Sequence, residues 1–337
     1  MEERYLPIGI QDFEKLRKGN YVYVDKTEYV WNLTRLSTPY FLSRPRRFGK
    51  SLLLSTMEYY FLGKKKLFEG LAIYEKEKDW TEYPVIKISF GSDNYPDLES
   101  LKSQINSILC EYEKKYELEV PDLRSAPRLK NLIKTAFEKT GKQVIILIDE
   151  YDKPILDALY TEYEEQNRQE LRSFYSPLKD CDKYIRFLFI TGITKISFGN
   201  GFTGLNHLND IGLDNDYSSI CGISGNELEK YFMPEIEQLA EKQKLGMSDT
   251  IKKLGDWYGG YHFSHDVNEV CNPFSIMNAL NERKFEFYWT RREFCETKLG
   301  KQTEGLRRKR REHFGYINRL NRHRRRPRPL PPHDGKA

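Results

Sequence analysis

Residues 44–51 of the chain read RPRRFGKS and end in side chains that together can bind phosphate. Gly49 lets the backbone come close to an anion, the Lys50 ammonium can reach the β- and γ-phosphates of a nucleotide, and the Ser51 hydroxyl can ligate Mg²⁺. If a helix begins at this point, the N–H groups of Ser51 and Leu52 face the same anion. The segment therefore predicts a phosphate-binding loop.

The loop departs from the full pattern G-x-x-x-x-G-K-S at its first position, where this sequence has Arg44. Gly-Lys-Ser alone arises by chance in many chains, so its weight depends on the elements around it. Because Arg44 replaces the pattern's first glycine, the conformation of the loop's first turn is not predicted by the pattern.

A second pair of residues could complete such a site. Residues 144–148 are apolar (VIILI) and are followed directly by Asp149 and Glu150. An acidic residue at the carboxyl end of a strand can hold Mg²⁺, and a following glutamate can polarise the attacking water. A buried strand that ends in a solvated acidic turn would explain this half alone, but it does not explain both halves in this order.

Apolar runs alternate with helical patterns over the first part of the chain and predict the elements that position these residues. The runs typical of buried strands are residues 40–42, 85–90, 144–148 and 185–190, and a further strand-like run lies at 21–24. The segments that predict helices are residues 28–36, 51–61, 98–115, 128–139 and 164–175. Near-continuous apolar strands that alternate with helices indicate a three-layer α/β fold with a mostly parallel sheet, which we place at residues 1–215.

The pattern changes twice after residue 215. Helical segments at 226–242, 248–257 and 273–281 predict a small, mainly helical lid domain over residues 216–289. Residues 290–337 have 16 Lys plus Arg against 5 Asp plus Glu, whereas the first 289 residues have 39 against 45. This basic tail is rich in Arg and Pro and has few apolar residues, so we expect it to be disordered.

Composition argues against several other classes of protein. No stretch approaches the roughly 18 to 20 apolar residues of a membrane span, and the polar start does not resemble a signal peptide, so we expect a cytoplasmic protein that does not bind a membrane. The five cysteines lie far apart and predict reduced thiols rather than a disulfide framework or a zinc site. His262 and His265 lack further ligands nearby, so a turn near a helix end is a better interpretation than a metal site.

Several sequence blocks along the chain occur together in one known family. They are residues 6–13 (LPIGIQDF), 21–27 (YVYVDKT), 44–51 (RPRRFGKS), 148–154 (IDEYDKP), 191–194 (TGIT), 204–209 (GLNHLN), 257–263 (WYGGYHF) and 272–274 (NPF). With these blocks the chain resembles the predicted AAA-ATPase-like proteins, a family within the wider P-loop ATPases. The resemblance extends to about Trp289 and implies that Arg44 is the family's own variant of the loop.

The resemblance implies roles for the residues at the two halves of the site. Lys50 and Ser51 would contact phosphate and Mg²⁺. Asp149 would bind the metal, and Glu150 would be the catalytic base. The implied cofactors are therefore ATP and Mg²⁺, and the choice of ATP over GTP is an inference from the family alone.

The resemblance also implies roles for residues that follow the strand expected at 185–190. Thr191 or Thr194 would sense the γ-phosphate. The residues expected to be catalytic are Lys50, Glu150 and Thr194. Asp152 and Lys153 are expected to pair with each other or to cap the next helix.

The loop arginines could add positive charge near the phosphates, because fixed donors stabilise developing charge in a dry site. A solvated basic loop is the alternative interpretation. The residues expected to contact the nucleotide are Arg44, Arg46, Arg47, Phe48, Gly49, Lys50, Ser51 and Leu52.

Members of this family commonly carry a further C-terminal domain that resembles PD-(D/E)xK nucleases. After Trp289 the sequence no longer matches the family, and the basic tail stands in the place of that domain. We hypothesise a frameshifted or truncated reading frame, which reading the coding DNA in the other two frames would test. Selection for nucleic-acid binding through the tail is the alternative.

These observations leave two functions of different classes. The first is a Mg²⁺-dependent ATPase in which hydrolysis drives or gates movement of the helical lid. The alternative is a nucleotide-gated binding switch or scaffold that turns over little ATP and presents a surface to a protein partner, a second copy of the chain or a nucleic acid. Binding without hydrolysis by the isolated chain would favour the switch.

Overall fold

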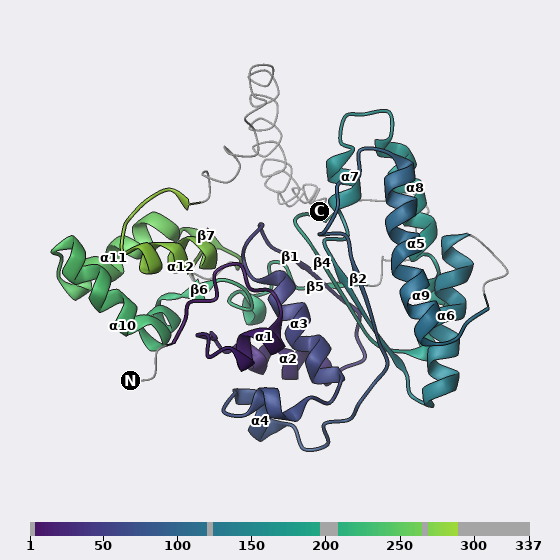
Figure 1. Cartoon of the computed structure of the whole chain (residues 1–337), viewed down its shortest axis with the longest axis horizontal. Coiled ribbons are helices and arrows are strands. Elements are labelled where there is room, and N and C mark those ends of the chain that lie inside the picture. The colour runs from purple at the N-terminus through teal and green to yellow at the C-terminus, as the bar shows by residue number, and fades with distance from the viewer. Residues whose placement is uncertain (1–3, 120–123, 196–207, 265–268, 289–337) are drawn as a thin grey trace, which may run out of the picture. The chain divides into compact units, whose positions relative to one another are not determined.

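Four strands predicted from the sequence form the central sheet together with a short fifth strand. The computed structural model describes residues 4–119, 124–195, 208–264 and 269–288. The strands of this sheet are β1 (Tyr40–Ser43), β2 (Val85–Ser89), β3 (Val144–Asp149), β4 (Ile185–Gly192) and β5 (Asn209–Asp210). All five run parallel, in the order β2-β3-β4-β1-β5 (Figure 1). The prediction of an α/β fold with a parallel sheet is confirmed.

The strand order brings the two halves of the predicted site together. Both β1 and β3 are neighbours of β4, so the residues that follow these three strands lie side by side. In the ladders, Ser43 of β1 lies opposite Gly192 of β4, and Ile148 of β3 lies opposite Ile190 of β4. Parallel strands end at the same edge of a sheet, which is where open α/β sheets bind ligands.

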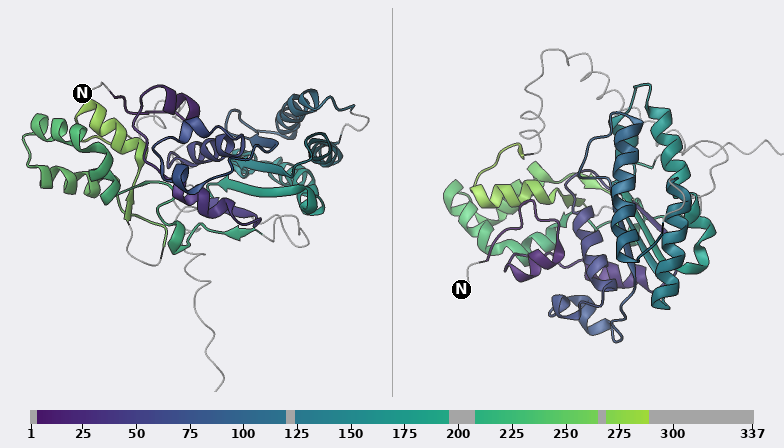
Figure 2. Two further views of the ribbon diagram at one scale, coloured as in Figure 1. Left: turned by 90° about the horizontal axis from the view of Figure 1, so that it is seen from below. Right: turned by 45° about the vertical axis from the view of Figure 1, so that its right-hand side comes forward.

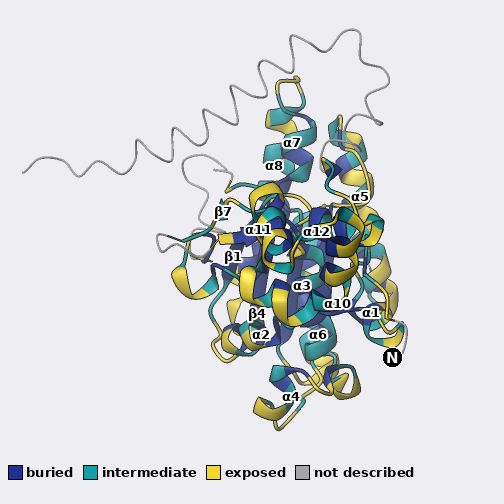
Figure 3. Cartoon of the chain, turned by 90° about the vertical axis from the view of Figure 1, so that its left-hand side faces the viewer, coloured by how far each residue is buried: buried dark blue, intermediate teal, exposed yellow. Residues whose placement is uncertain are grey.

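Helices on both faces of the sheet make the fold three-layered. The main helices of this part are α2 (Thr27–Thr34), α3 (Lys50–Phe61), α5 (Leu98–Lys115), α6 (Ser125–Thr140) and α8 (Glu164–Tyr175). Figures 1 and 2 show α3 on one face of the sheet and α5, α6 and α8 on the other. Alternate strand residues face the two layers: Ile146 belongs to the buried cluster with residues of α5, α6 and α8, whereas the ring of Phe187 lies 5.2 Å from that of Phe61 in α3. Buried residues accordingly gather between the layers (Figure 3).

Short helices connect or flank these elements. They are α1 (Phe13–Lys18), α4 (Ala72–Lys76), α7 (Lys153–Asp157) and α9 (Pro177–Asp180). Asp12 caps α1, since its Oδ1 accepts from the Lys15 N–H at 2.6 Å. The Phe13 N–H then donates to Ser55 Oγ at 2.9 Å, which fastens α1 to α3.

The C-terminal part of the described chain is a group of helices with a small antiparallel sheet, which we call the helical module (residues 223–282). Its elements are β6 (Ile223–Ser224), α10 (Gly225–Gln243), α11 (Met247–Tyr258), β7 (Tyr261–His262), β8 (Glu269–Cys271) and α12 (Pro273–Glu282). The first helix begins at a capping box, in which Ser224 and Glu227 each accept from the other's backbone N–H. The last begins with Pro273, whose missing N–H costs nothing at that position.

The N-terminal segment ties the helical module to the sheet. Lys26 donates to Glu227 Oε1 at 2.5 Å and to the Ser219 carbonyl at 2.6 Å, and Arg4 pairs with Glu235 at 2.7 Å. By its contacts the chain divides into two units, 1–286 and 287–337, and the second lies almost wholly outside the described residues. The predicted boundaries at residues 215 and 289 stay predictions.

Most predicted elements are confirmed, including the helices expected at 98–115 and 164–175, which match α5 and α8 to the residue. The strand expected at 21–24 is wrong, because its strand pairing with the described residues is limited to an isolated bridge between Tyr5 and Tyr21. In the described parts of the chain, no helix combines the length and apolar character that crossing a membrane requires. The basic tail lies outside the described residues.

Candidate functional site

The loop between β1 and α3 takes its shape from two residues with left-handed backbone. Gly49, which precedes α3, has a φ of 95°, a value that L side chains rarely adopt. An added Cβ at Gly49 would meet no atom within 4 Å, so the backbone conformation and not the available space requires glycine. Arg47 also has a positive φ, of 65°. The loop thus turns sharply into the helix.

Lys50 is the first residue of α3 and its side chain folds back over the loop. The residue is 5% exposed, and its Nζ donates to the carbonyls of Arg44 and Pro45 at 2.9 Å each. Burial lowers the pKa of Lys50, and the negative charge of Asp149 opposes this shift. The ammonium therefore rests against two neutral acceptors, which a phosphate oxygen could replace.

Ser51 and Leu52 lie in the first turn of α3 and are partly exposed. Backbone N–H groups in a first turn have no acceptor within the helix, because the bonding pattern begins with the Leu53 N–H, which donates to the Gly49 carbonyl at 3.0 Å. The helix N-terminus also carries a partial positive charge. This end of α3 can therefore bind an anion.

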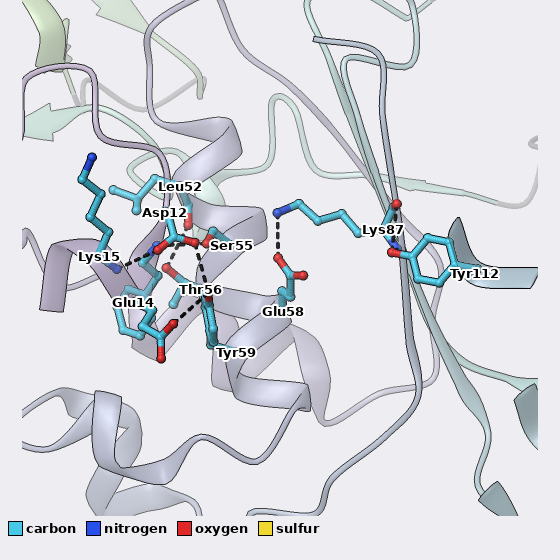
Figure 4. Close-up of polar contacts among 11 residues, drawn as sticks. Asp12, Glu14, Lys15, Leu52, Ser55, Thr56, Glu58, Tyr59, Lys87 and Tyr112 are labelled. Atoms are coloured by element: carbon cyan, nitrogen blue, oxygen red, sulfur yellow. Dashed lines mark hydrogen bonds and ion pairs between the residues drawn. The ribbon is translucent and has the colours of Figure 1, made fainter. Parts of the chain in front are cut away.

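Helix α3 is held from two sides (Figure 4). On one side, Tyr59 donates to Asp12 Oδ2 at 3.1 Å. On the other, Lys87 of β2 pairs with Glu58 at 2.6 Å. Together with the bond between α1 and Ser55, these contacts fix α3 so that its N-terminus stays beside the sheet edge.

Asp149 ends β3 and is 4% exposed. Its Oδ1 accepts from Thr191 Oγ1 of the neighbouring strand β4 at 2.5 Å. A hydrogen bond to a charged acceptor in a buried place holds the carboxylate in one orientation. The two side chains therefore form a fixed acidic group beside Lys50.

Glu150 follows Asp149 and has an unusual backbone, with a φ of 52°. The side chain accepts no hydrogen bond from residues in the described parts of the chain, and it lies against Gly91, where an added Cβ would be 3.4 Å from Glu150 Cδ. Burial raises the pKa of Glu150, Asp149 adds to this, and Lys50 and Arg46 oppose it. A half-buried carboxylate with a raised pKa is suited to take a proton.

The loop arginines lie in different environments. Arg44 is 1% exposed and its guanidinium donates to the carbonyls of Gly212 and Tyr217, at 2.7 and 2.9 Å. Arg46 and Arg47 are exposed, and the Arg47 guanidinium lies 4.2 Å from the ring centre of Phe274 in α12. The Arg44 guanidinium therefore lies among backbone carbonyls, and its predicted contact with the nucleotide stays a prediction.

Phe48 joins the loop to the helical module. It is 1% exposed, and its ring lies 4.7 Å from Tyr261 and 5.5 Å from Phe263 in edge-to-face geometry. The Gly222 N–H donates to its carbonyl at 3.1 Å. The side chain thus packs into protein.

Asp152 has a position that the sequence analysis missed. Pairing with Lys153 and capping of α7 are both wrong, because Lys153 pairs with Asp157 at 2.5 Å and Asp152 makes no capping bond. Instead, Asp152 Oδ2 accepts from the N–H groups of Ile193 and Thr194 at 2.8 Å each. The sequence shows a second aspartate three residues after Asp149, but it does not indicate which backbone N–H groups this carboxylate binds.

Two hydrogen bonds hold the backbone of Thr194 next to Asp152 and Tyr151. Its N–H is held by Asp152, and its carbonyl accepts from Tyr151 Oη at 3.1 Å. Thr191 is fully buried and engaged with Asp149. The sheet edge therefore brings together Lys50, Asp149, Glu150 and both threonine segments.

The oxygen ligands present at the sheet edge are of the kind that Mg²⁺ takes. Among the described residues, no group of three or more His, Cys, Asp or Glu could hold a metal ion, and the four cysteines there are free. Mg²⁺ usually keeps several waters and takes one or two protein ligands together with phosphate oxygens. The Asp149 carboxylate and the Ser51 hydroxyl would provide such a pair. His262 lies in strand β7 and not in the expected turn, and His265 lies outside the described residues.

The fold and the site define the class of protein. A parallel sheet whose first strand leads through a glycine-containing loop into a helix, with Asp149 and Glu150 at the end of a nearby strand, is a P-loop NTPase-like α/β fold. Residues 7–200 match the family model described as Predicted AAA-ATPase, and the chain belongs to this AAA-ATPase-like family. Membership supports a general role in ATP binding.

The chain is also similar to a protein of Azotobacter chroococcum mcd 1 described as "Uncharacterized protein in vnfD 5'region". The two are 39% identical over 292 residues, which are 86% of this chain and 54% of the relative. The chain thus spans about half the length of the relative that it matches. The name of the relative states no activity.

Proposed function

We propose that the chain binds ATP with Mg²⁺ at the carboxyl edge of β1, β3 and β4 and hydrolyses it to ADP and phosphate. The observation that carries the proposal is the convergence of Lys50, Asp149 and Glu150 at this edge, where the charges of all three act on one another. Charges in such a partly desolvated place interact more strongly than they do in water. Membership of the AAA-ATPase-like family supports ATP as the nucleotide.

Lys50 and the first turn of α3 would bind the phosphates. The Lys50 ammonium would leave the carbonyls of Arg44 and Pro45 and donate to the β- and γ-phosphates, while the N–H groups of Ser51 and Leu52 would face the same oxygens. The exposed Arg46 would add positive charge nearby. This exchange replaces neutral acceptors by anionic ones, so it favours the bound state.

Asp149 and Ser51 would hold the metal. The Thr191 hydroxyl already occupies Asp149 Oδ1, which leaves Oδ2 for a ligand. Bound Mg²⁺ would neutralise part of the phosphate charge. Thr191 would thereby keep the carboxylate in the orientation that the metal requires.

Glu150 would be the general base, and Thr194 the group that responds to the γ-phosphate. The raised pKa of Glu150 brings its basicity closer to what proton abstraction from water needs. The Thr194 backbone is fixed by Asp152, so its hydroxyl would hold a defined place beside the reacting phosphate.

Movement of the helical module would accompany these steps. Phe48 and Arg47 of the loop both touch aromatic residues of the module, namely Tyr261 and Phe274. The same contacts also favour the second candidate, a nucleotide-gated binding switch with little turnover, because a change in the loop would reach the module without any hydrolysis.

Phosphate release by the purified full chain separates these functions. We expect the parent protein to release phosphate from ATP only with Mg²⁺, and Glu150→Gln to bind ATP but release phosphate at least 100-fold more slowly. Glu162→Gln, at an exposed position outside the site, is the matched control and should behave like the parent.

Three outcomes are informative. Equal turnover by Glu150→Gln and the parent would contradict the assignment of the base. Tight binding without turnover by the parent would favour the switch. A folded parent that binds no ATP would contradict both candidate functions.

A further inference from the structure

Arg44 stands where the full phosphate-loop pattern has its first glycine, and it is the most buried arginine of the loop. Its Nη1 donates to the Gly212 carbonyl at 2.7 Å and to the Ser43 carbonyl at 2.9 Å. Its Nη2 donates to the Tyr217 carbonyl at 2.9 Å. The guanidinium carbon lies 4.1 Å from the ring centre of Phe263. The cation is thus enclosed by carbonyl oxygens and an aromatic face.

The backbone of Arg44 takes part in the same site. Its N–H donates to the Gly192 carbonyl at 3.1 Å, at the end of β4, and its carbonyl accepts from Lys50 Nζ at 2.9 Å. One residue therefore joins the end of β4, the catalytic lysine and the segment from Gly212 to Tyr217.

Burying the Arg44 guanidinium costs free energy. A buried cation loses its hydration, and burial lowers the pKa of Arg44 to about 10. Its hydrogen-bond partners in the described residues are carbonyl oxygens, and no carboxylate accepts from it. Only the planar fork of an arginine can reach carbonyls on two sides while it stacks on a ring.

We infer that Arg44 is a positioning residue that fixes the phosphate-binding loop from behind and holds the carbonyl that receives Lys50. In this chain the arginine takes over the shaping of the first turn, which glycine performs in the full pattern. The inference rests on the proposed function, because what the loop is shaped for is ATP. It also predicts that restoring the glycine damages the site.

The test compares ATP affinity among variants of the full chain. Arg44→Gly restores the pattern G-x-x-x-x-G-K-S, and Arg44→Ala leaves a space that a free guanidinium ion can fill. Arg17→Ala is the matched control, since Arg17 also donates to two carbonyls, those of Leu67 and Glu69, but lies in α1. Dissociation constants are measured with Mg²⁺ and a fluorescent ATP analogue, well below the unfolding temperature of each variant.

We expect Arg44→Gly and Arg44→Ala to raise the dissociation constant by about tenfold or more, the usual effect of losing hydrogen bonds to a charged group. Millimolar guanidinium chloride, far below denaturing concentrations, should restore binding to Arg44→Ala and leave the parent unchanged. Arg17→Ala should lower the melting temperature but keep the parental dissociation constant. If Arg44→Ala does not fold, Arg44→Lys, which keeps the charge and loses the fork, should show an intermediate loss of affinity.

Parental affinity in Arg44→Gly, or in Arg44→Lys where that variant has to be used, would overturn the inference while the proposed function stands. Equal losses of affinity in Arg44→Ala and Arg17→Ala would overturn it as well, because a general loss of stability would then explain both. A folded parent that binds no ATP analogue would instead overturn the proposed function, and this inference with it.

Discussion

Lys50 and Arg44 are two buried cations in one loop, and they differ in how firmly the protein holds them. Lys50 rests on two carbonyls through one rotatable ammonium, so a phosphate can attract it away. Arg44 makes bonds in several directions through a rigid fork. We therefore regard Lys50 as the cation that meets the ligand and Arg44 as the cation that shapes the loop.

Asp152 is a further buried charge, and its two oxygens are used unequally. Oδ2 accepts from two N–H groups, whereas Oδ1 has no hydrogen-bond partner among the described residues. Burial raises its pKa from 3.8 to about 6, against the attraction of Lys50. The folded state therefore holds a proton on Asp152 more tightly than the unfolded state does.

This shift predicts a pH dependence of stability. The stabilisation from the protonated form is fully present below about pH 4 and is lost as the pH rises through about 6. The side chain of the Asp152→Asn variant does not titrate. Between those pH values, the free energy of unfolding of the parent should therefore fall relative to that of the variant by on the order of 2 kcal/mol. Urea unfolding at several pH values measures it, with the exposed Asp180→Asn as control. The same pH dependence in both variants would contradict the assignment.

At this scale the sequence predicted which residues lie at one sheet edge better than it predicted their contacts. The types and spacing of Gly49, Lys50 and Asp149 indicated their place at one sheet edge. The environments of Arg44 and Asp152 could not be predicted, because all of their backbone partners except the Ser43 carbonyl are more than 40 residues away in the chain. Backbone acceptors leave no mark in the sequence.

At the scale of elements, β2 presents an edge of the central sheet, where unpaired backbone groups invite other strands. Tyr112 of α5 covers part of this edge. The Lys87 N–H donates to Tyr112 Oη at 2.7 Å, and the same hydroxyl donates to the Lys87 carbonyl at 3.2 Å (Figure 4). One side chain thus satisfies both backbone groups of one residue.

Tyr112→Phe should therefore lower the free energy of unfolding by about 1 to 2 kcal/mol, because both Lys87 backbone groups lose their partner while the apolar packing stays. Chemical denaturation measures the change. Tyr116→Phe at the end of the same helix is the control, since the Tyr116 hydroxyl makes no hydrogen bond with the residues that the structure describes. If both variants lose equal stability, the hydroxyl of Tyr112 does not protect the edge.

Long elements were predictable and short ones were not. The helices α5 and α8 and the strands β1 to β4 have strong periodicity or continuous apolar runs. By contrast, β5 and the three strands of the helical module are two or three residues long, so they carry no period. The run at 21–24 has strand-like residues but no neighbouring strand to form a ladder with.

At the scale of the whole compact unit, an ion pair joins segments about 200 residues apart. Lys26 is 8% exposed and reaches both the Ser219 carbonyl and Glu227, which also closes the capping box of α10. Burial lowers the pKa of Lys26, and Glu227 opposes the shift. Breaking a buried pair leaves an uncompensated charge behind.

Lys26→Met should lower the free energy of unfolding by roughly 2 to 4 kcal/mol and remove hydrogen-exchange protection first at the start of α10. Lys18→Met is the control, because Lys18 forms an exposed pair with Glu14. Native-state hydrogen exchange measures the protection of α10 in both variants. Unchanged protection of α10 in Lys26→Met would show that the N-terminal segment does not anchor the helical module.

We propose that the loop after β1 binds ATP through Lys50 in the presence of Mg²⁺. Calorimetric titration of ATP into the full chain, with Mg²⁺ and with a chelator, tests it most directly, beside Lys50→Ala and the surface control Lys139→Ala. We expect the parent and Lys139→Ala to bind ATP, more weakly without Mg²⁺. Folded Lys50→Ala should lose at least 100-fold in affinity. Parental affinity in Lys50→Ala, or a folded parent that binds no ATP, would contradict it.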